Sequence, residues 1–381
     1  MAAFAPLRLR LIKPEWTDRV PSPAHDALSP AQRIAHLRAN PDSYLGVTRG
    51  PEDYEGTETP SPQELVSRGK VALDALLEAG SFSEIRGDRF YVYRLELDGW
   101  SQTGIVGGIH LDDYESGTIR IHEAIQPERA AHLALHAQVV GAQSSPIAVA
   151  HHPKREIAAV LERVDSIDPD LQFKMPDGLE QTIWTLPESD NDVIREGLDD
   201  ERLYLIDGHH RTAAASLRYA QGASPWALAA LFSTDQLQNR AFHRFALPAV
   251  ADPLAELLKI SGAEKGRIGD GIGHLQVYFD GQWITVPHQR AHRPLERLDM
   301  WQFEEMIRPR LGEGATVRFR MADGDQEALL KSVDESGELL VLMTAVTMPQ
   351  LFAVADAGDV MPPKSTYFEP KVRSGIFLRH L

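Results

Sequence analysis

The chain has 381 residues, a net charge of −16 and no cysteine. Its length predicts either two compact units or one large α/β body with attachments. The negative charge disfavours nucleic-acid binding, and the lack of cysteine excludes disulfides, thiolate nucleophiles and Cys-based zinc sites.

Residues 1–80 predict an N-terminal segment of loops and helices. The start of the chain carries arginines inside its apolar part and has no signal-peptide core, so we expect a cytoplasmic protein. Ser29-Pro30 and Ser61-Pro62 each place a capping residue before a proline, which predicts that a helix begins at each pair. Gly80 predicts the end of the second helix.

Residues 81–250 predict a mixed α/β core. Two strands, over 89–97 and 103–111, are expected to join through a turn at Asp98-Gly99. The further expected elements are helices over 126–142 and 210–221 and strands over 144–152, 202–206 and 226–233. The longest apolar run, 226–232, is too short to cross a bilayer, so no membrane partner is expected.

Residues 251–381 predict an additional α+β region. A hairpin over 273–286 is expected to turn at Asp280-Gly281. The other expected elements are helices over 252–262 and 300–311 and strands over 315–321, 338–343 and 375–381. We expect the end of this region to pack back on the core.

The first candidate site is the stretch YLIDGHHRTAAA, where a strand ends at Asp207-Gly208 and turns directly into a helix. The first N–H groups of a helix lack partners within the helix and lie at the positive end of its dipole, so they attract anions. Gly208 allows the backbone to approach a ligand closely. Arg211 offers a planar fork to phosphate oxygens. His209 and His210 add donors that also move protons near neutral pH.

This stretch therefore predicts a phosphate site, and the alternative is an ordinary Asp-Gly turn that begins a helix. In such a turn Asp207 can cap the helix, orient a histidine or bind Mg²⁺. No Walker-type phosphate loop occurs anywhere in the chain. His209 and His210 are adjacent and project in different directions, so they do not form a zinc signature.

A second candidate lies in residues 361–375, with the sequence MPPKSTYFEPKVRSG. Lys364, Ser365, Thr366 and Lys371 occur there on a segment that prolines hold in shape. Two lysines and two hydroxyls suit an anion, and we expect this segment to lie beside the Asp207–Arg211 turn. The alternative is a surface loop.

Two weaker candidates are charged pairs near strands. His122-Glu123 follows an expected strand, where the carboxylate can serve as a base or a metal ligand. His243-Arg244, in the stretch AFHRFAL, is interpreted as a salt-bridged connector.

The stretches DGHHR, TGIVGGIHLDDYESGTIRIHE, AFHRFAL and MPPKSTYFEPKVRSGIF together resemble the signatures of a bacterial and archaeal family of unknown function, number 1015 in its series. Its DGHHR segment is similar to the glycine–arginine phosphate motif of the ParB/sulfiredoxin superfamily. That resemblance implies a ParB/sulfiredoxin-like core that binds a nucleotide at residues 207–211. Some members of the superfamily phosphorylate free serine.

The chain departs from the family pattern at two places. Residues 22–26 read SPAHD where the family usually has Pro-Pro-Tyr-Asp, and residues 124–127 read AIQP where Thr and then Lys are usual. These departures bear on catalysis more than on binding.

Three hypotheses follow. The first is a kinase that uses ATP or ADP with Mg²⁺ and phosphorylates a small molecule such as L-serine, with catalytic roles for Glu123, Asp207 and His209. Its nucleotide-binding residues would be Gly208, His210, Arg211, Lys364, Ser365, Thr366 and Lys371. The second is a nucleotide-sensing regulator with little turnover. The third, a metallohydrolase, lacks a recognisable ligand spacing, and sulfiredoxin chemistry is excluded because the chain has no cysteine.

Overall fold

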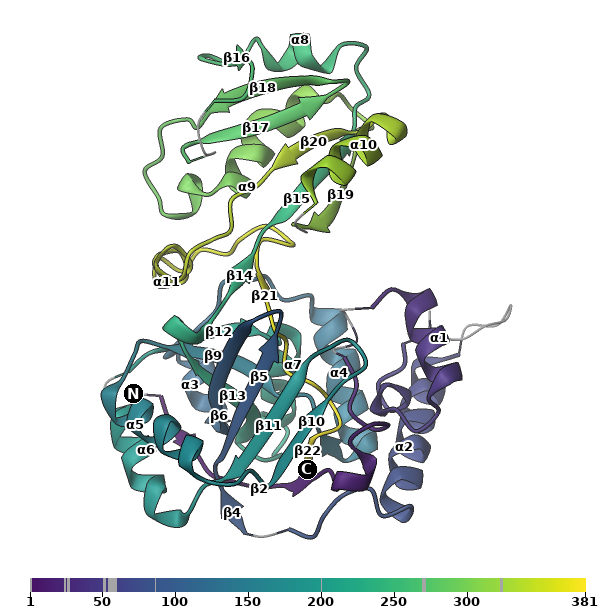
Figure 1. The fold of residues 1–381 in the computed structure, drawn as a ribbon, viewed down its shortest axis with the longest axis vertical. Coiled ribbons are helices and arrows are strands. Elements are labelled where there is room, and N and C mark those ends of the chain that lie inside the picture. The colour runs from purple at the N-terminus through teal and green to yellow at the C-terminus, as the bar shows by residue number, and fades with distance from the viewer. Residues whose placement is uncertain are drawn as a thin grey trace. The chain divides into compact units, whose positions relative to one another are not determined.

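The computed structural model describes residues 2–23, 25, 28–50, 53, 60–85, 87–199, 201–268, 272–322 and 325–381. The chain forms two compact units, one of residues 1–121, 125–237 and 370–381 and one of residues 122–124 and 238–369 (Figure 1). The mixed α/β class is confirmed. The ParB/sulfiredoxin-like core and the division at residues 80 and 250 stay predictions. Among the described residues, no helix combines the length and the apolar composition that a membrane span requires.

The first unit contains most of the elements expected for residues 1–237. Its helices are α1 Pro30–Ala39, α2 Pro62–Glu78, α3 Leu111–Glu115, α4 Pro127–Val140, α5 Arg155–Arg163, α6 Asn191–Gly197 and α7 His209–Tyr219. Its longer strands are β5 Tyr91–Leu97, β6 Trp100–His110, β9 Ile147–His151, β10 Leu171–Lys174, β11 Glu180–Thr185, β12 Leu203–Asp207, β13 Trp226–Ser233 and β22 Phe377–His380. Its short strands are β1 Phe4–Ala5, β2 Leu7–Arg8, β3 Arg10–Leu11, β4 Asp88–Arg89, β7 Ile119–Arg120 and β8 Ala142–Gln143.

The main sheet of this unit is mixed, with the strand order β10-β11-β5-β6-β13-β9-β12-β7, and β1 also pairs with β6. Strand β9 runs parallel to β13 and antiparallel to β12, whereas β12 runs parallel to β7. The carboxyl ends of β12 and β7 therefore lie at the same edge of the sheet. The last strand, β22, pairs with β3 and β8, so the end of the chain belongs to this unit.

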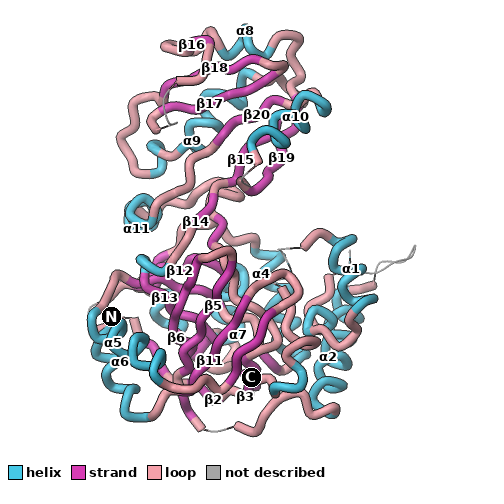
Figure 2. Tube along the Cα trace, in the orientation of Figure 1, coloured by secondary structure: helices cyan, strands magenta, loops and turns pink. Residues whose placement is uncertain are grey.

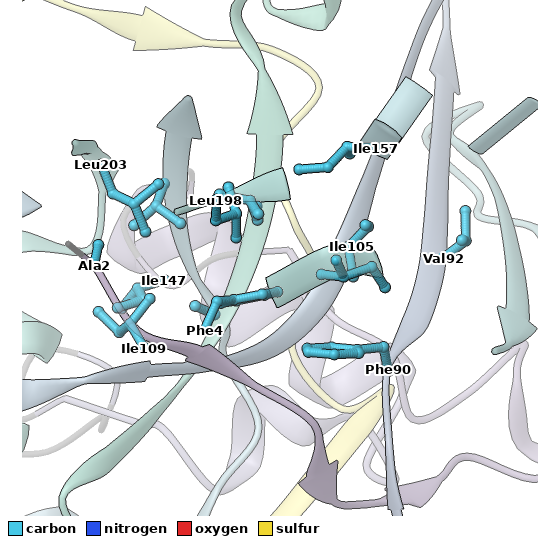
Figure 3. Close-up of a cluster of buried hydrophobic side chains, with 14 of the residues drawn as sticks. Ala2, Phe4, Phe90, Val92, Ile105, Ile109, Ile147, Ile157, Leu198 and Leu203 are labelled. Carbon is cyan, nitrogen blue, oxygen red and sulfur yellow. The ribbon is translucent and has the colours of Figure 1, made fainter. Parts of the chain in front are cut away.

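A buried apolar cluster covers one face of the sheet (Figure 3). The rings of Phe4 and Phe90 stack at a centroid distance of 5.2 Å, and Ile157 of α5 packs into the same cluster. Helix α7 packs against α4, and α4 packs against α2. The β12–α7 junction is thus held by packed elements and not by a loop alone.

The helix starts predicted at Ser29 and Ser61 are confirmed. Each serine hydroxyl oxygen accepts a hydrogen bond from the N–H three residues later, and each serine N–H donates to the side-chain oxygen of Gln32 or Glu64. The expected turn at Asp98-Gly99 is also present, with φ angles of 50° and 80° that suit a tight hairpin.

The second unit is built on an antiparallel sheet with the strand order β16-β18-β17-β20-β15-β19, whose strands are magenta in Figure 2. Its strands are β14 Asn239–Arg240, β15 Phe242–Leu247, β16 Glu264–Lys265, β17 His274–Phe279, β18 Gln282–Pro287, β19 Thr316–Met321, β20 Leu339–Leu342 and β21 Tyr367–Phe368. Its helices are α8 Pro253–Leu257, α9 Asp299–Gln302, α10 Gln326–Ser336 and α11 Met348–Asp356.

The expected hairpin at Asp280-Gly281 joins β17 and β18. The helix expected over 300–311 is irregular, because α9 continues as a wider π turn over Phe303–Ile307 and then a 3₁₀ turn over Arg308–Arg310. Pro309 lies in that last turn and has no N–H to donate. Leu329 and Val333 of α10 pack on one group of sheet residues, while Phe303 and Ile307 pack on another.

Candidate functional site

The turn that follows β12 lies at an irregularity of the sheet. Residues 203–206 are buried, as their unbroken apolar sequence predicts. The pairing of β12 with β9 shifts register between Leu205 and Asp207, and bulges of this kind re-aim the residues that follow. Asp207 is the last residue of the strand, and α7 begins at His209.

Gly208 is required by both the backbone and the packing of this turn. Its φ of 94° and ψ of 26° lie in the left-handed region. A Cβ at this position would lie 2.8 Å from Cγ2 of Ile147 and 3.1 Å from Nη2 of Arg211. Gly208 is also the N-cap of α7 and supplies no side-chain cap. The first N–H groups of α7, at the positive end of its dipole, therefore receive no capping bond from the side chain of residue 208.

Two cations meet on the Asp207 carboxylate. Lys371 Nζ lies 2.9 Å from Oδ1 of Asp207, and Arg211 Nη2 donates to Oδ2. The predicted proximity of the C-terminal segment to this turn is thus confirmed for Lys371. Arg211 Nη1 also donates to the carbonyl oxygens of Ser145 and Pro146, at 3.0 and 2.7 Å. Arg211 therefore fixes the turn to the segment that leads into β9.

The ionisation of Asp207 reflects this pairing. Burial raises the pKa of its carboxyl, but the charges of Lys371 and Arg211 outweigh burial and hold the pKa well below its ordinary value. The ring of His209 acts in the same direction. Asp207 is therefore a carboxylate with a cation on each oxygen, which makes it a weak proton acceptor.

The two histidines differ in surroundings. His209 is 3% exposed and begins α7. His210 is less buried, and its Nε2 accepts a hydrogen bond of 3.1 Å from the N–H of Gln126, just before α4. The segment that connects β7 to α4 is thereby tied to the turn.

The remaining predicted site residues belong to the second unit. Glu123 forms an isolated parallel bridge with Met361, and the hydroxyl of Ser365 donates to the carbonyl oxygen of Pro362 at 2.5 Å. Thr366 Oγ1 lies 3.2 Å from Nε2 of His122. Lys364 has a φ of 55°. The contributions of Glu123 and of residues 364–366 to the phosphate site stay predictions.

Sequence reasoning missed the carbonyl oxygens of residues 145 and 146 and the N–H of Gln126, because backbone groups leave no side-chain signal. It also misjudged Arg244. This residue lies inside β15, is 1% exposed and forms no ion pair with any described residue, so the interpretation as a salt-bridged connector is wrong for Arg244. The run Phe-Ala-Leu after Arg244, with no acid beside it, was the available signal.

The departure at residues 22–26 falls partly outside the described residues, because 24, 26 and 27 are not among them. Within it, His25 Nε2 lies 2.9 Å from Oδ2 of the fully buried Asp53. Arg33 Nε donates to the other oxygen of Asp53 at 2.5 Å. Burial raises the pKa of Asp53, but the Gly50 N–H, Arg33 and His25 together lower it. Both oxygens of the Asp53 carboxylate therefore take part in bonds that hold His25 to Arg33 of α1.

The described part of the chain contains no group of three or more His, Asp or Glu side chains arranged to hold a metal ion. Asp207, the predicted Mg²⁺ ligand, already has a cation at each oxygen. Binding of Mg²⁺ to Asp207 therefore requires that the ion displace Lys371 or Arg211 from the carboxylate. The metal role of Asp207 stays a prediction.

The fold and this turn define a two-unit α/β protein with a glycine-capped helix at the end of a central strand. The chain belongs to the family described as "Protein of unknown function (DUF1015)", which matches residues 2–301. The predicted family membership is confirmed. The matched span ends before residues 361–375, so the resemblance of that last stretch stays a prediction. No curated protein matches the chain.

Several solved structures show a distant likeness. A free serine kinase variant in complex with ADP is 12% identical, covers 72% of this chain and 91% of its own, and gives a TM-score of 0.40. SbnI with C-terminal truncation from Staphylococcus aureus is 12% identical, with coverages of 71% and 85% and a TM-score of 0.41. A conserved hypothetical protein from Pyrococcus furiosus is 14% identical, with coverages of 72% and 94% and a TM-score of 0.37. Likeness at this level does not define a function.

Proposed function

We propose that the protein binds ATP or ADP through its phosphate groups at the turn of residues 207–211 and transfers phosphate to the hydroxyl of a small molecule such as free L-serine. The observation that carries this proposal is the convergence of Lys371 and Arg211 on Asp207, beside a helix that begins at a glycine. The resemblance of DGHHR to a glycine–arginine phosphate motif supports it.

The charges at the turn favour an anionic ligand. Lys371 and Arg211 bring two positive charges against the single negative charge of Asp207, and the start of α7 adds the positive end of a helix dipole. Gly208 has no side chain that could lie between a phosphate group and the first backbone N–H groups of α7. Bound phosphate would share Lys371 and Arg211 with Asp207.

Within this proposal His210 and Arg211 hold phosphate, Asp207 orients the two cations, and His209 is a proton donor. Lys364, Ser365 and Thr366 are proposed as further ligands of the nucleotide, and Glu123 as the base for the acceptor hydroxyl. Mg²⁺ bound with the nucleotide supplies charge neutralisation, which is the main requirement of phosphoryl transfer. Asp207 is the proposed Mg²⁺ ligand of the chain.

Nucleotide titration of four proteins tests the binding step. Wild type, Arg211→Ala, Lys371→Ala and Arg218→Ala are each titrated with ATP, ADP, CTP and GTP, with and without Mg²⁺. Arg211→Ala and Lys371→Ala should each weaken binding by about 1.5–3 kcal/mol, the usual value for a charge-assisted hydrogen bond. Arg218 is the matched control because it lies in the last turn of the same helix.

Equal affinity of folded Arg211→Ala and wild type for every nucleotide would remove this turn from consideration. An equal loss in Arg218→Ala would show that the effect comes from the stability of α7. Phosphate transfer is then assayed with radiolabelled ATP and with L-serine or other small alcohols as acceptors.

A nucleotide-sensing regulator is the second candidate, and the state of Asp207 favours it over a kinase in which Asp207 is the base. A carboxylate with a cation on each oxygen and a lowered pKa binds well but abstracts protons poorly. Tight nucleotide binding without transfer to any amino acid or small alcohol supports this candidate over the kinase.

A further inference from the structure

Arg244 is a buried guanidinium whose hydrogen bonds are only partly made. It lies in β15 and is 1% exposed. Its Nη1 donates to the carbonyl oxygens of Phe242 and Lys364, at 3.1 and 2.9 Å. Its Nε and Nη2 are buried and have no hydrogen-bond partner among the described residues. These two nitrogens form one edge of the guanidinium, the edge that binds both oxygens of a carboxylate or phosphate.

The positive charge of Arg244 also has no counterion among the described residues. Burial lowers its pKa to about 10, and the charge of Glu304 opposes this only in part. Glu304 itself pairs with Arg308 at 2.6 Å. The guanidinium stacks on the ring of Phe319 at 4.5 Å, which supplies a cation–π contact but no hydrogen bond. An unneutralised buried cation is costly, so the site favours the arrival of an anion.

A second cation lies against the same strand. Lys364 Nζ is 5.5 Å from the ring centroid of Phe242, and the Lys364 carbonyl oxygen accepts the hydrogen bond from Arg244. Lys364 adopts a φ of 55°, in the left-handed region that strains a residue with a side chain. The flanking residues hold it there, because Ser365 bonds to Pro362 and Thr366 contacts His122. No ion pair of the described residues includes Lys364.

We propose that Arg244 and Lys364 form a second oxyanion site, carried wholly by the second unit, that takes a carboxylate or phosphate group of a small ligand. The edge of Nε and Nη2 binds the two oxygens, and Lys364 neutralises their charge. Phe319, whose ring stacks on the face of the guanidinium, is 38% exposed and lies on the edge strand β19. Arg244 has no part in the function proposed above, whereas Lys364 is common to both proposals, so the site is tested with the Asp207–Arg211 turn disabled.

Calorimetric titration with three probes tests this site. The probes are inorganic phosphate, L-serine, and 2-aminoethanol, which keeps the amine and hydroxyl of serine but has no carboxylate. Wild type should bind phosphate or L-serine and should not bind 2-aminoethanol. Arg244→Lys keeps the positive charge but loses the planar guanidinium. It should lower the affinity for the probe that wild type binds at least tenfold. Lys364→Ala should weaken it as well, while the exposed Lys331→Ala, in the same unit, should not.

Each titration is repeated in an Arg211→Ala background to remove the proposed nucleotide site. Retained binding of phosphate or L-serine in Arg211→Ala, lost on adding Lys364→Ala, supports the second site and shows which oxyanion it prefers. Binding of neither probe to wild type overturns it. Binding that Arg211→Ala abolishes and Lys364→Ala leaves intact also overturns it. Because Lys364 is exposed, its variant keeps the test valid even if Arg244→Lys does not fold.

Discussion

Asp207 lies between two cations that come from distant parts of the sequence. Lys371 is 164 residues away along the chain, whereas Arg211 is one helical turn away. The side chain of Asp207 is 20% exposed, so solvent screens these pairs only in part. Loss of the carboxylate would leave both cations uncompensated, and their mutual repulsion would loosen the junction.

The stability of the protein should therefore depend on pH through Asp207. Because the fold lowers the pKa of this carboxyl, its ionisation stabilises the folded state above the ordinary pKa of about 4. That stabilisation is lost as pH falls below about 4, toward the lower pKa of the folded state. Asp207→Asn should reduce the free energy of unfolding by about 1–3 kcal/mol at pH 7, the cost of unpaired charged groups.

Urea denaturation at pH 7 and pH 3 measures this effect. The difference between wild type and Asp207→Asn should shrink at pH 3. Asp192→Asn serves as the control, because Asp192 forms only an exposed pair with Arg195 at 3.5 Å. A pH-independent difference for Asp207→Asn would mean that shape, and not charge, accounts for the loss.

At the level of elements, the junction between β12 and α7 depends on a glycine in two separate ways. Gly208→Ala introduces left-handed strain and a Cβ that lies 2.8 Å from Ile147. The substitution should lower the free energy of unfolding by about 1–3 kcal/mol, and it should also weaken nucleotide binding. Gly222→Ala is a matched control, since Gly222 has a φ of 90° and open space where its Cβ would lie.

Comparison of the two glycine variants separates strain from crowding. Both should show the backbone cost in chemical denaturation, and only Gly208→Ala should lose nucleotide affinity. Similar nucleotide affinity in both variants would mean that the close approach at Gly208 has no part in binding.

The sequence predicted those elements whose signals are local. The helices after Ser29 and Ser61 and the hairpins at Asp98 and Asp280 were found because caps and left-handed turns depend on neighbouring residues. No element was predicted for residues 155–163, which form α5, although its apolar residues are spaced for one buried face. A helix was predicted over 300–311, but its irregular form after α9 was not, because π turns have no simple sequence signature.

The candidate site was predictable only in part, for the same reason. The strand–turn–helix and its glycine were visible in DGHHR, because five adjacent residues carry the signal. Tertiary packing decides the rest, including the bonds of Arg211 to residues 145 and 146. The isolation of Arg244 was not predicted either, because an acid on a neighbouring strand was expected to pair with it.

For the whole molecule, the two proposed functions differ in whether the protein transfers phosphate or only binds a nucleotide. If it is a kinase, a carboxylate must orient the acceptor hydroxyl. Asp207 is poorly suited because Lys371 and Arg211 occupy its oxygens. Glu123 is therefore our first choice for the base, and Asp207 the second.

Glu123→Gln keeps the shape of the side chain and removes its charge. If Glu123 is the base, the substitution should leave nucleotide affinity within a few fold and reduce the rate of phosphate transfer by about 10²-fold or more. The measurement is steady-state transfer to L-serine, with Glu128→Gln, an exposed residue in the first turn of α4, as the control. Turnover of Glu123→Gln at the wild-type rate would exclude Glu123 as the base. If wild type binds nucleotide tightly and transfers phosphate to no acceptor, the protein is a regulator and no base is needed.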